Sequence, residues 1–186
     1  MELPEKHIKN TKLVPNRTAL LEHFPKNGVV AEIGVAEGSY AEKILSITRP
    51  LTLHLIDVWE SERYGEEAMQ TVLERFKGPI ESGQVVIHRG RSQDILKTFE
   101  DNTFDWVYLD TSHKYEDTLE ELEVCRRKVK DDGLIAGHDY TAGNVASALR
   151  YGVVDAVNET CVKHDLEMAY LSNEAGRYLS FAIRNI

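Results

Sequence analysis

Cysteine is scarce in this sequence, and long apolar segments are absent from it. The two cysteines, Cys125 and Cys161, are too few for a disulfide framework or a cysteine metal knuckle, so we expect buried free thiols. No apolar run approaches the roughly 20 residues that cross a bilayer, and no segment typical of a signal peptide stands at the N-terminus. These absences predict a cytoplasmic protein without a membrane partner.

Positive charge is also limited. Lys and Arg number 22 and Asp and Glu number 31, which gives a formal net charge of −9. Such a protein is poorly suited to hold the phosphate backbone of a nucleic acid. We therefore expect a small-molecule substrate and no nucleic-acid partner, although a local basic patch is compatible with a negative total.

Apolar runs and amphipathic segments alternate along the chain after Gly28, as in βαβ units with a buried parallel sheet. The strands expected from this pattern are residues 29–33, 51–56, 85–87, 104–109 and 133–137. The expected helices are residues 40–47, 66–76, 93–99, 115–129 and 145–161.

Both ends of the chain depart from this alternation. Residues 166–171 and 178–184 are strand-like, and the segment SNEAGR between them is too short for a crossover helix, so an antiparallel hairpin is expected. The predicted fold class is α/β: a Rossmann-like, doubly wound, mostly parallel sheet with helices on both faces and a C-terminal antiparallel β-hairpin. Residues 1–27 are expected to form a tail, or a loosely docked cover, and a short helix before the domain of residues 28–186.

Each expected parallel strand ends on small or ionisable residues. The strand ends are Glu32-Ile33-Gly34, Asp57, Arg89-Gly90-Arg91-Ser92, Asp110 and His138-Asp139. Open parallel sheets bind their ligands at the carboxyl ends of the strands, so these residues should border one site.

The turn after the first strand, EIGVAEGS at residues 32–39, spaces its glycines as ExGxxxG rather than as the GxGxxG of a dinucleotide site. Glycine lets a ligand approach the backbone closely, and the acid at Glu32 suits the amino group of methionine better than a pyrophosphate. Asp57 follows about 20 residues later, where an acid can hydrogen-bond two ribose hydroxyls. A ligand-free glycine turn and a helix N-cap at Asp57 are the alternatives.

Parts of the sequence resemble the class I S-adenosylmethionine-dependent methyltransferases, in particular the metal-dependent small-molecule O-methyltransferases of the catechol and macrolide-sugar type. The segments that carry the resemblance are VVAEIGVAEGSYAEKIL, FDWVYLDTSHKYED and GLIAGHDY, and it runs from about Gly28 to the C-terminus. The resemblance implies that S-adenosylmethionine is the cofactor and that residues 28–186 form its binding domain.

The same resemblance implies roles for single residues. Glu32 and the glycines would shape the methionine end of the pocket, Asp57 would hold the ribose, and Ser92 would lie near the adenine or cap the following helix. The implied cofactor-binding residues are Glu32, Gly34, Ala36, Gly38, Ser39, Asp57, Val58 and Ser92.

In the related enzymes, acidic or amide side chains after the fourth and fifth strands hold a divalent metal such as Mg or Mn. The corresponding residues here are Asp110, His138 and Asp139. His138 departs from the pattern, because histidine is a poorer ligand for Mg²⁺ than for Mn²⁺, Fe²⁺ or Zn²⁺. The alternative is that Asp110 only lines the cofactor site and that His138 packs in the core.

His113 stands three residues after Asp110, at the position that carries the general base in the related enzymes. An imidazole with a pKa of about 6.5 can accept a hydroxyl proton at neutral pH. The resemblance therefore implies O-methylation of a small hydroxylated molecule with His113 as the catalytic residue, although a lone histidine before a helix is often a capping or surface residue.

The motifs of competing enzyme classes are absent from this sequence. Nucleobase amino-methyltransferases carry an Asn/Asp-Pro-Pro-aromatic motif where this chain has Asp-Thr-Ser-His, and NAD-dependent oxidoreductases carry GxGxxG. A catalytically idle adenosyl-binding module and a metal-independent methyltransferase with a different acceptor remain open. A homo-oligomer is also compatible with the sequence, because a short enzyme can use a neighbouring copy to close its site.

Overall fold

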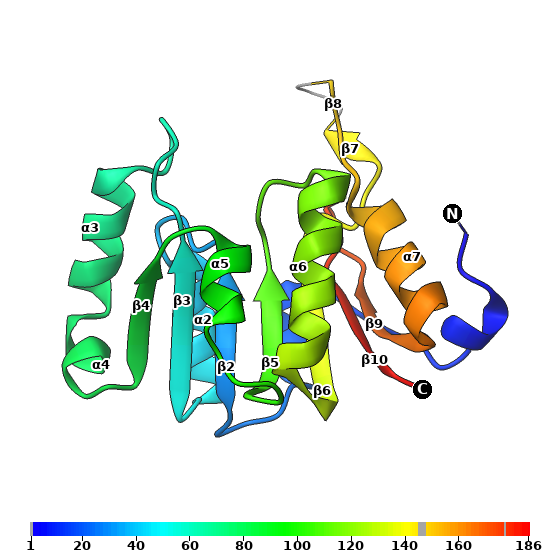
Figure 1. Cartoon of the computed structure of the whole chain (residues 1–186), viewed down its shortest axis with the longest axis horizontal. Coiled ribbons are helices and arrows are strands. Elements are labelled where there is room, and N and C mark those ends of the chain that lie inside the picture. The colour runs from blue at the N-terminus through cyan, green and yellow to red at the C-terminus, as the bar shows by residue number, and fades with distance from the viewer. Residues whose placement is uncertain (1, 145–147, 177) are drawn as a thin grey trace.

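A mostly parallel sheet runs through the molecule and separates two layers of helices (Figure 1). The computed structural model describes residues 2–144, 148–176 and 178–186, and within them the large sheet has eight strands in the order β1-β9-β10-β6-β5-β2-β3-β4. These strands are β1 (Lys12–Val14), β2 (Val29–Ile33), β3 (Thr52–Asp57), β4 (Val85–Arg89), β5 (Phe104–Leu109), β6 (Val129–Gly137), β9 (Leu166–Ser172) and β10 (Phe181–Asn185).

Strand direction follows the prediction. The neighbours from β6 through β5, β2 and β3 to β4 pair in parallel, whereas β10 lies antiparallel to both β9 and β6. The sequence-based fold class, a doubly wound parallel sheet that ends in an antiparallel hairpin, is therefore confirmed. A separate two-stranded antiparallel sheet joins β7 (Gly143–Asn144) to β8 (Leu149–Arg150).

Helices cover both faces of the sheet. The helices are α1 (Arg17–Leu21), α2 (Ser39–Thr48), α3 (Glu66–Arg75), α4 (Lys77–Glu81), α5 (Ser92–Lys97), α6 (Tyr115–Lys128) and α7 (Val153–His164), together with the 3₁₀ helix η1 (Glu5–His7). Side chains alternate along a strand, so Val30 of β2 packs in a core with α1, α2 and α3, while Ala31 packs in a second core with α5, α6 and α7. No described helix is long and apolar enough to cross a membrane.

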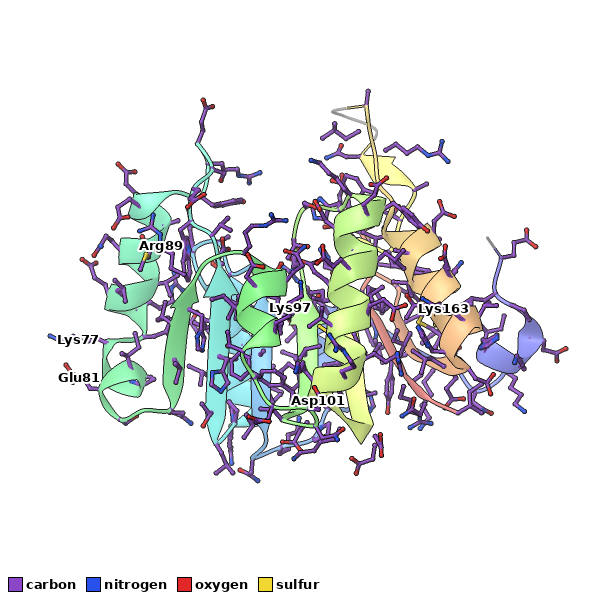
Figure 2. All side chains as sticks on the ribbon, viewed as in Figure 1. Lys77, Glu81, Arg89, Lys97, Asp101 and Lys163 are labelled. Atoms are coloured by element: carbon purple, nitrogen blue, oxygen red, sulfur yellow. The ribbon has the colours of Figure 1, made fainter. Side chains whose placement is uncertain are left out.

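Exposed ion pairs link the helices of one layer. Lys97 of α5 lies 3.1 Å from Glu120 of α6, and Lys163 of α7 lies 2.7 Å from Glu123 of α6. The two lysines, on α5 and α7, are labelled in Figure 2. Exposed pairs of this kind contribute about 0.2–1 kcal/mol each. The helix layer is therefore stabilised mainly by the apolar core beneath it.

The N-terminal segment adds a strand to the sheet that the sequence did not predict. Strand β1 pairs in parallel with β9, with Lys12 opposite Tyr170. His7 is fully buried, and its Nδ1 lies 2.6 Å from the carbonyl oxygen of Leu166. The apolar pattern could not reveal this strand, because in β1 only Val14 is buried and the contacts are made by the backbone. The segment covers the free edge of β9, which would otherwise expose unpaired backbone groups.

The predicted helix over residues 145–161 begins later than expected. Helix α7 starts at Val153, residues 143–144 and 149–150 form the small β7–β8 sheet, and residues 145–147 lie outside the described residues. Gly152 explains the late start. Its N–H donates to the carbonyl oxygen of His113, and a side chain at Gly152 would overlap the backbone of Tyr115. The chain therefore turns against the start of α6 before the helix begins.

His54 of β3 and His88 of β4 should make the stability of the fold depend on pH. Their ring nitrogens lie 2.9 Å apart, and burial, with a smaller effect of the neighbouring His88, lowers the pKa of His54 to about 4. The unfolded chain takes up this proton near pH 6.5, so the stabilisation present at pH 7 is lost as the pH falls toward 4. Urea unfolding should therefore show that His54→Asn loses about 2 kcal/mol less than the wild type between pH 7 and pH 5. Equal losses in both proteins would contradict this assignment.

Candidate active site

A cavity of about 670 Å³ opens at the carboxyl edge of the parallel strands. This volume lies in the range of pockets that hold a nucleoside-sized ligand. Most of the residues that the sequence predicted to bind the cofactor line this cavity. They are Glu32, Gly34, Ala36, Ser39, Asp57, Val58 and Ser92. Asp110 and His113 line it as well, whereas Gly38, His138 and Asp139 are not among its lining residues. The ends of β2, β3 and β5 and the start of α5 therefore contribute to one site.

The turn after β2 depends on glycine. Gly34 has φ +87°, and a side chain there would overlap the carbonyl oxygen of Asp110. Gly38 has φ +77°, and an added Cβ would lie 2.7 Å from the ring of Phe76. These two positions let the turn pass between the end of β5 and helix α3, which explains the predicted glycine spacing.

Asp57, at the end of β3, holds this turn in place. Its Oδ2 accepts hydrogen bonds from the N–H groups of Val35 (2.7 Å) and Ala36 (2.9 Å), and its Oδ1 accepts one from Trp59 (3.0 Å). A carboxylate has about four acceptor positions, so lone pairs remain for ligand hydroxyls. Trp59 itself is 1% exposed and donates its Nε1–H to the carbonyl oxygen of Ala36, so it packs beneath the turn rather than covering the cavity.

The far end of the cavity is formed by the loop before α5. Ser92 is the first residue of α5, and its hydroxyl donates to Glu121 Oε1 at 2.5 Å rather than capping the helix. The other oxygen of Glu121 accepts a hydrogen bond from Thr111 at 2.7 Å, and burial raises the pKa of this carboxyl. Gln93 is buried and lines the cavity, a position that the sequence reasoning missed although it follows Ser92 directly.

Glu32 and Arg17 border the opposite end. Glu32 is 2% exposed, and within the described residues its Oε2 has no hydrogen-bond partner. Burial raises the pKa of this carboxyl well above its ordinary value, and the charge of Asp110 adds to the effect. Arg17 lines the cavity from α1, and its Nη1 lies 3.5 Å from Asp110 Oδ2. Sequence reasoning did not find Arg17, because no motif marks it.

Asp110, His113 and Asp139 form a compact cluster. Each offers one potential ligand atom, and these atoms lie within 4.8 Å of one another. His113 Nε2 is 2.8 Å from Asp139 Oδ2 and 3.6 Å from Asp110 Oδ1. Neither contact has the direction of a hydrogen bond, so among the described residues this buried nitrogen has no hydrogen-bond partner. His113 and Asp139 both adopt positive φ, 60° and 57°, a strained conformation that is common at functional sites.

His138 also approaches the two carboxylates. Its Nδ1 lies 3.3 Å from Asp139 and 3.7 Å from Asp110, and it borders a small separate cavity behind the cluster. Both histidines therefore approach the two aspartates, and the compact group of three potential ligand atoms is the one that contains His113.

The carboxylates control the charge of His113. Burial alone would lower the pKa of its imidazole, but Asp110 and Asp139 outweigh burial and raise that pKa to about 9. Burial opposes ionisation of Asp139 as well, yet His113 and His138 hold the pKa of its carboxyl well below the usual range.

Known sequences identify the type of domain. Residues 31–140, which are more than half of the chain, match a family described as a methyltransferase domain. The chain belongs to this family. The methyltransferase is thus an S-adenosylmethionine-dependent enzyme of class I, which confirms the class I part of the predicted family, the enzyme class and the methyl donor. The match does not extend to the O-methyltransferase type. No curated protein matches the sequence.

Solved structures share the fold of the methyltransferase at low identity. A candidate rRNA methylase from Clostridium thermocellum superposes with a TM-score of 0.68 at 13% identity, covering 93% of this chain and 99% of that chain. A SAM-dependent methyltransferase from Aquifex aeolicus superposes with a TM-score of 0.65 at 16% identity, covering 87% of this chain and 84% of that chain. A ribosomal protein L11 methylase from Lactobacillus delbrueckii subsp. bulgaricus superposes with a TM-score of 0.63 at 14% identity, covering 91% of this chain and 77% of that chain. The rRNA methylase and the ribosomal protein methylase are named for different acceptors, so the shared fold does not specify the acceptor.

Replacing Gly34 by alanine should damage both the fold and the cofactor site of the methyltransferase. The substitution combines a positive φ with overlap of the Asp110 carbonyl oxygen. Gly83→Ala is a matched control, because Gly83 has φ +78° with nothing within 4 Å of an added Cβ. We expect Gly83→Ala to cost about 1–2 kcal/mol and Gly34→Ala distinctly more, with loss of S-adenosylhomocysteine binding. Thermal unfolding and calorimetry would measure both effects, and equal destabilisation would contradict the packing argument.

Proposed function

We propose that the methyltransferase transfers the methyl group to an oxygen of a small hydroxylated molecule, assisted by a divalent cation at Asp110, His113 and Asp139. The observation that carries this proposal is the buried His113 Nε2, which lies between two carboxylates without a hydrogen bond. A nitrogen in that position fits a cation better than it fits a hydrogen-bond network, because a satisfied network would use the short contact to Asp139.

The donor set suits a borderline divalent cation. Two carboxylates and an imidazole favour Mn²⁺, Fe²⁺ or Zn²⁺ over Mg²⁺. Asp110 and His113 line the large cavity, so the cluster is open on the side where an acceptor would lie. A cation bound there would lower the pKa of an acceptor hydroxyl and hold its oxygen. His138, which contacts both carboxylates from behind, would orient them.

The protein's own contribution is alignment. Methyl transfer from a sulfonium is an in-line displacement, which requires the acceptor oxygen to be deprotonated and held opposite the leaving sulfur. Glu32 and the Gly34 turn border one part of the cavity, and Asp110 and His113 border the adjoining part. His113 would use the same atom, Nε2, as a metal ligand or as a general base. We favour the ligand role because that atom approaches both carboxylates.

A ring-containing acceptor is supported by aromatic side chains next to the cluster. The ring of His113 stacks on Tyr151 at 4.5 Å with an interplanar angle of 28°. Tyr178 lies 6.5 Å from Tyr151. Such a wall can pack against a hydroxylated ring, whether aromatic or sugar.

Charge favours a small molecule over RNA. The acidic residues that line the cavity outnumber its arginines: Glu32, Glu37, Asp57, Asp110, Asp117 and Glu121 against Arg17, Arg63 and Arg91. Together with a net charge of −9, this arrangement would repel a phosphate backbone. The likeness to the candidate rRNA methylase extends to the fold alone.

Metal titration of two histidine variants should separate the ligand from the residue behind it. In calorimetry with metal-free protein, Mn²⁺ should bind the wild type at one site, His113→Ala should abolish that binding, and His138→Ala should weaken it only about 10- to 100-fold. S-adenosylhomocysteine binding should persist in both variants, which shows that they are folded. Binding of Mn²⁺ to His113→Ala with wild-type affinity would exclude His113 as a ligand.

Turnover provides the second arm of this test. With S-adenosylmethionine and a panel of small diols, sugars and catechols, the wild type should form S-adenosylhomocysteine, and a chelator should stop the reaction. Methylation of RNA without turnover of any hydroxylated small molecule would contradict the proposed acceptor. Full activity in chelator would contradict metal assistance.

A further inference from the structure

The amino-acid end of the methyl donor carries two charges, a positive amino group and a negative carboxylate. A site that binds this end needs an acid and a base at one end of the cavity. Glu32 is a natural partner for the amino group, because its buried Oε2 has no partner within the described residues. The partner of the carboxylate is not indicated by any motif in the sequence.

The order of the strand ends, together with the contact of Arg17 with Asp110, places Arg17 at the end of the cavity where Glu32 lies. Along the carboxyl edge, β5 precedes β2, which is followed by β3 and β4. Asp57 and Ser92 therefore lie toward the β3–β4 side, where the nucleoside is expected, and Asp110 and Glu32 lie toward the β5–β2 side. Of the arginines that line the cavity, Arg17 contacts Asp110, whereas Arg91 adjoins Ser92.

Arg17 and Glu32 also share one face of the sheet. Side chains alternate along a strand, so Glu32 points to the same side as Val30, whose core contains α1 and α2. Arg17 is the first residue of α1 and Tyr40 lies in α2. The charge of Arg17 lowers the pKa of Glu32, against the larger opposing effect of burial, which is consistent with this proximity.

The backbone and the side chain of Arg17 are both held. Its N–H donates to Glu174 Oε1 at 3.1 Å, and its carbonyl oxygen accepts the hydroxyl of Tyr40 at 3.0 Å. The guanidinium lies 4.7 Å from the centre of the Tyr40 ring. Glu174 in turn accepts hydrogen bonds from Ser172 and Ser180. A surface arginine would not need such support.

The contact between Arg17 and Asp110 leaves room for a ligand. At 3.5 Å it is longer than the roughly 2.7–2.9 Å of a strong charge-assisted bond. A guanidinium has five N–H donors in a planar fork that matches a carboxylate.

We infer that Arg17 binds the α-carboxylate of S-adenosylmethionine, opposite Glu32, which binds the amino group. The inference rests on S-adenosylmethionine as the methyl donor. The N-terminal segment, which the sequence suggested to be a loose cover, thereby contributes a specificity residue. It lets the enzyme distinguish the intact donor from a decarboxylated one.

Two ligands and two variants test this inference. The ligands are S-adenosylhomocysteine and its decarboxylated analogue, which keeps the amino group, and both are titrated by calorimetry in chelator so that no metal contributes. Arg17→Gln should weaken the binding of S-adenosylhomocysteine about 10- to 100-fold and the binding of the decarboxylated analogue less than about threefold. Glu32→Gln should weaken the binding of both ligands to a similar extent. Arg17→Lys should lie between wild type and Arg17→Gln, because lysine keeps the charge but loses the fork.

The controls distinguish a binding role from a structural one. Arg75→Gln removes an arginine that pairs with Glu42 outside the cavity, and it should change neither affinity. Equal losses for both ligands in Arg17→Gln, or no loss for either, would overturn the inference while leaving the methyl donor in place. Failure of the wild type to bind S-adenosylhomocysteine would instead overturn the donor assignment and this inference together.

Discussion

The site depends on how closely the turn after β2 passes the end of β5. A side chain at Gly34 would overlap the carbonyl oxygen of Asp110, so these strand ends can approach only because position 34 has no Cβ. Asp57 completes the constraint from β3 by accepting the N–H groups of Val35 and Ala36. Three neighbouring strands are thereby locked at one edge, and the cavity opens where they meet.

This arrangement concentrates unfavourable features in a small volume. Glu32 and Glu121 are buried carboxyls, and Ala36, His113 and Asp139 adopt positive φ. Burying acids and straining the backbone both cost stability, and the two apolar cores on either side of the sheet offset that cost. A ligand that supplied positive charge would relieve the acids, which is the physical reason to expect a sulfonium, an amino group or a cation at this edge.

Much of the fold follows from local patterns. The central strands and the helices between them were predicted within a few residues, because buried strands are apolar runs and the helices are amphipathic. The exceptions are the short helix α4, which buries no side chain, and segments whose contacts are made by the backbone. Strand β1 buries only Val14, and the late start of α7 depends on Gly152 packing against Tyr115. A hydrophobic pattern carries no signal for either contact.

The sequence by itself determined the strand ends and the residue types on them. Residues 28–40, Asp57 and Asp110 identified the cofactor edge because parallel strands must end on the same side of their sheet. Only the tertiary structure brought His113 to Asp139 as well as to Asp110, because the loop after β5 turns through a positive φ at His113 to reach the end of β6. Only the tertiary structure brought Arg17 to Asp110, across a separation of 93 residues, because the N-terminal segment docks on β9 through backbone hydrogen bonds that leave no periodic mark.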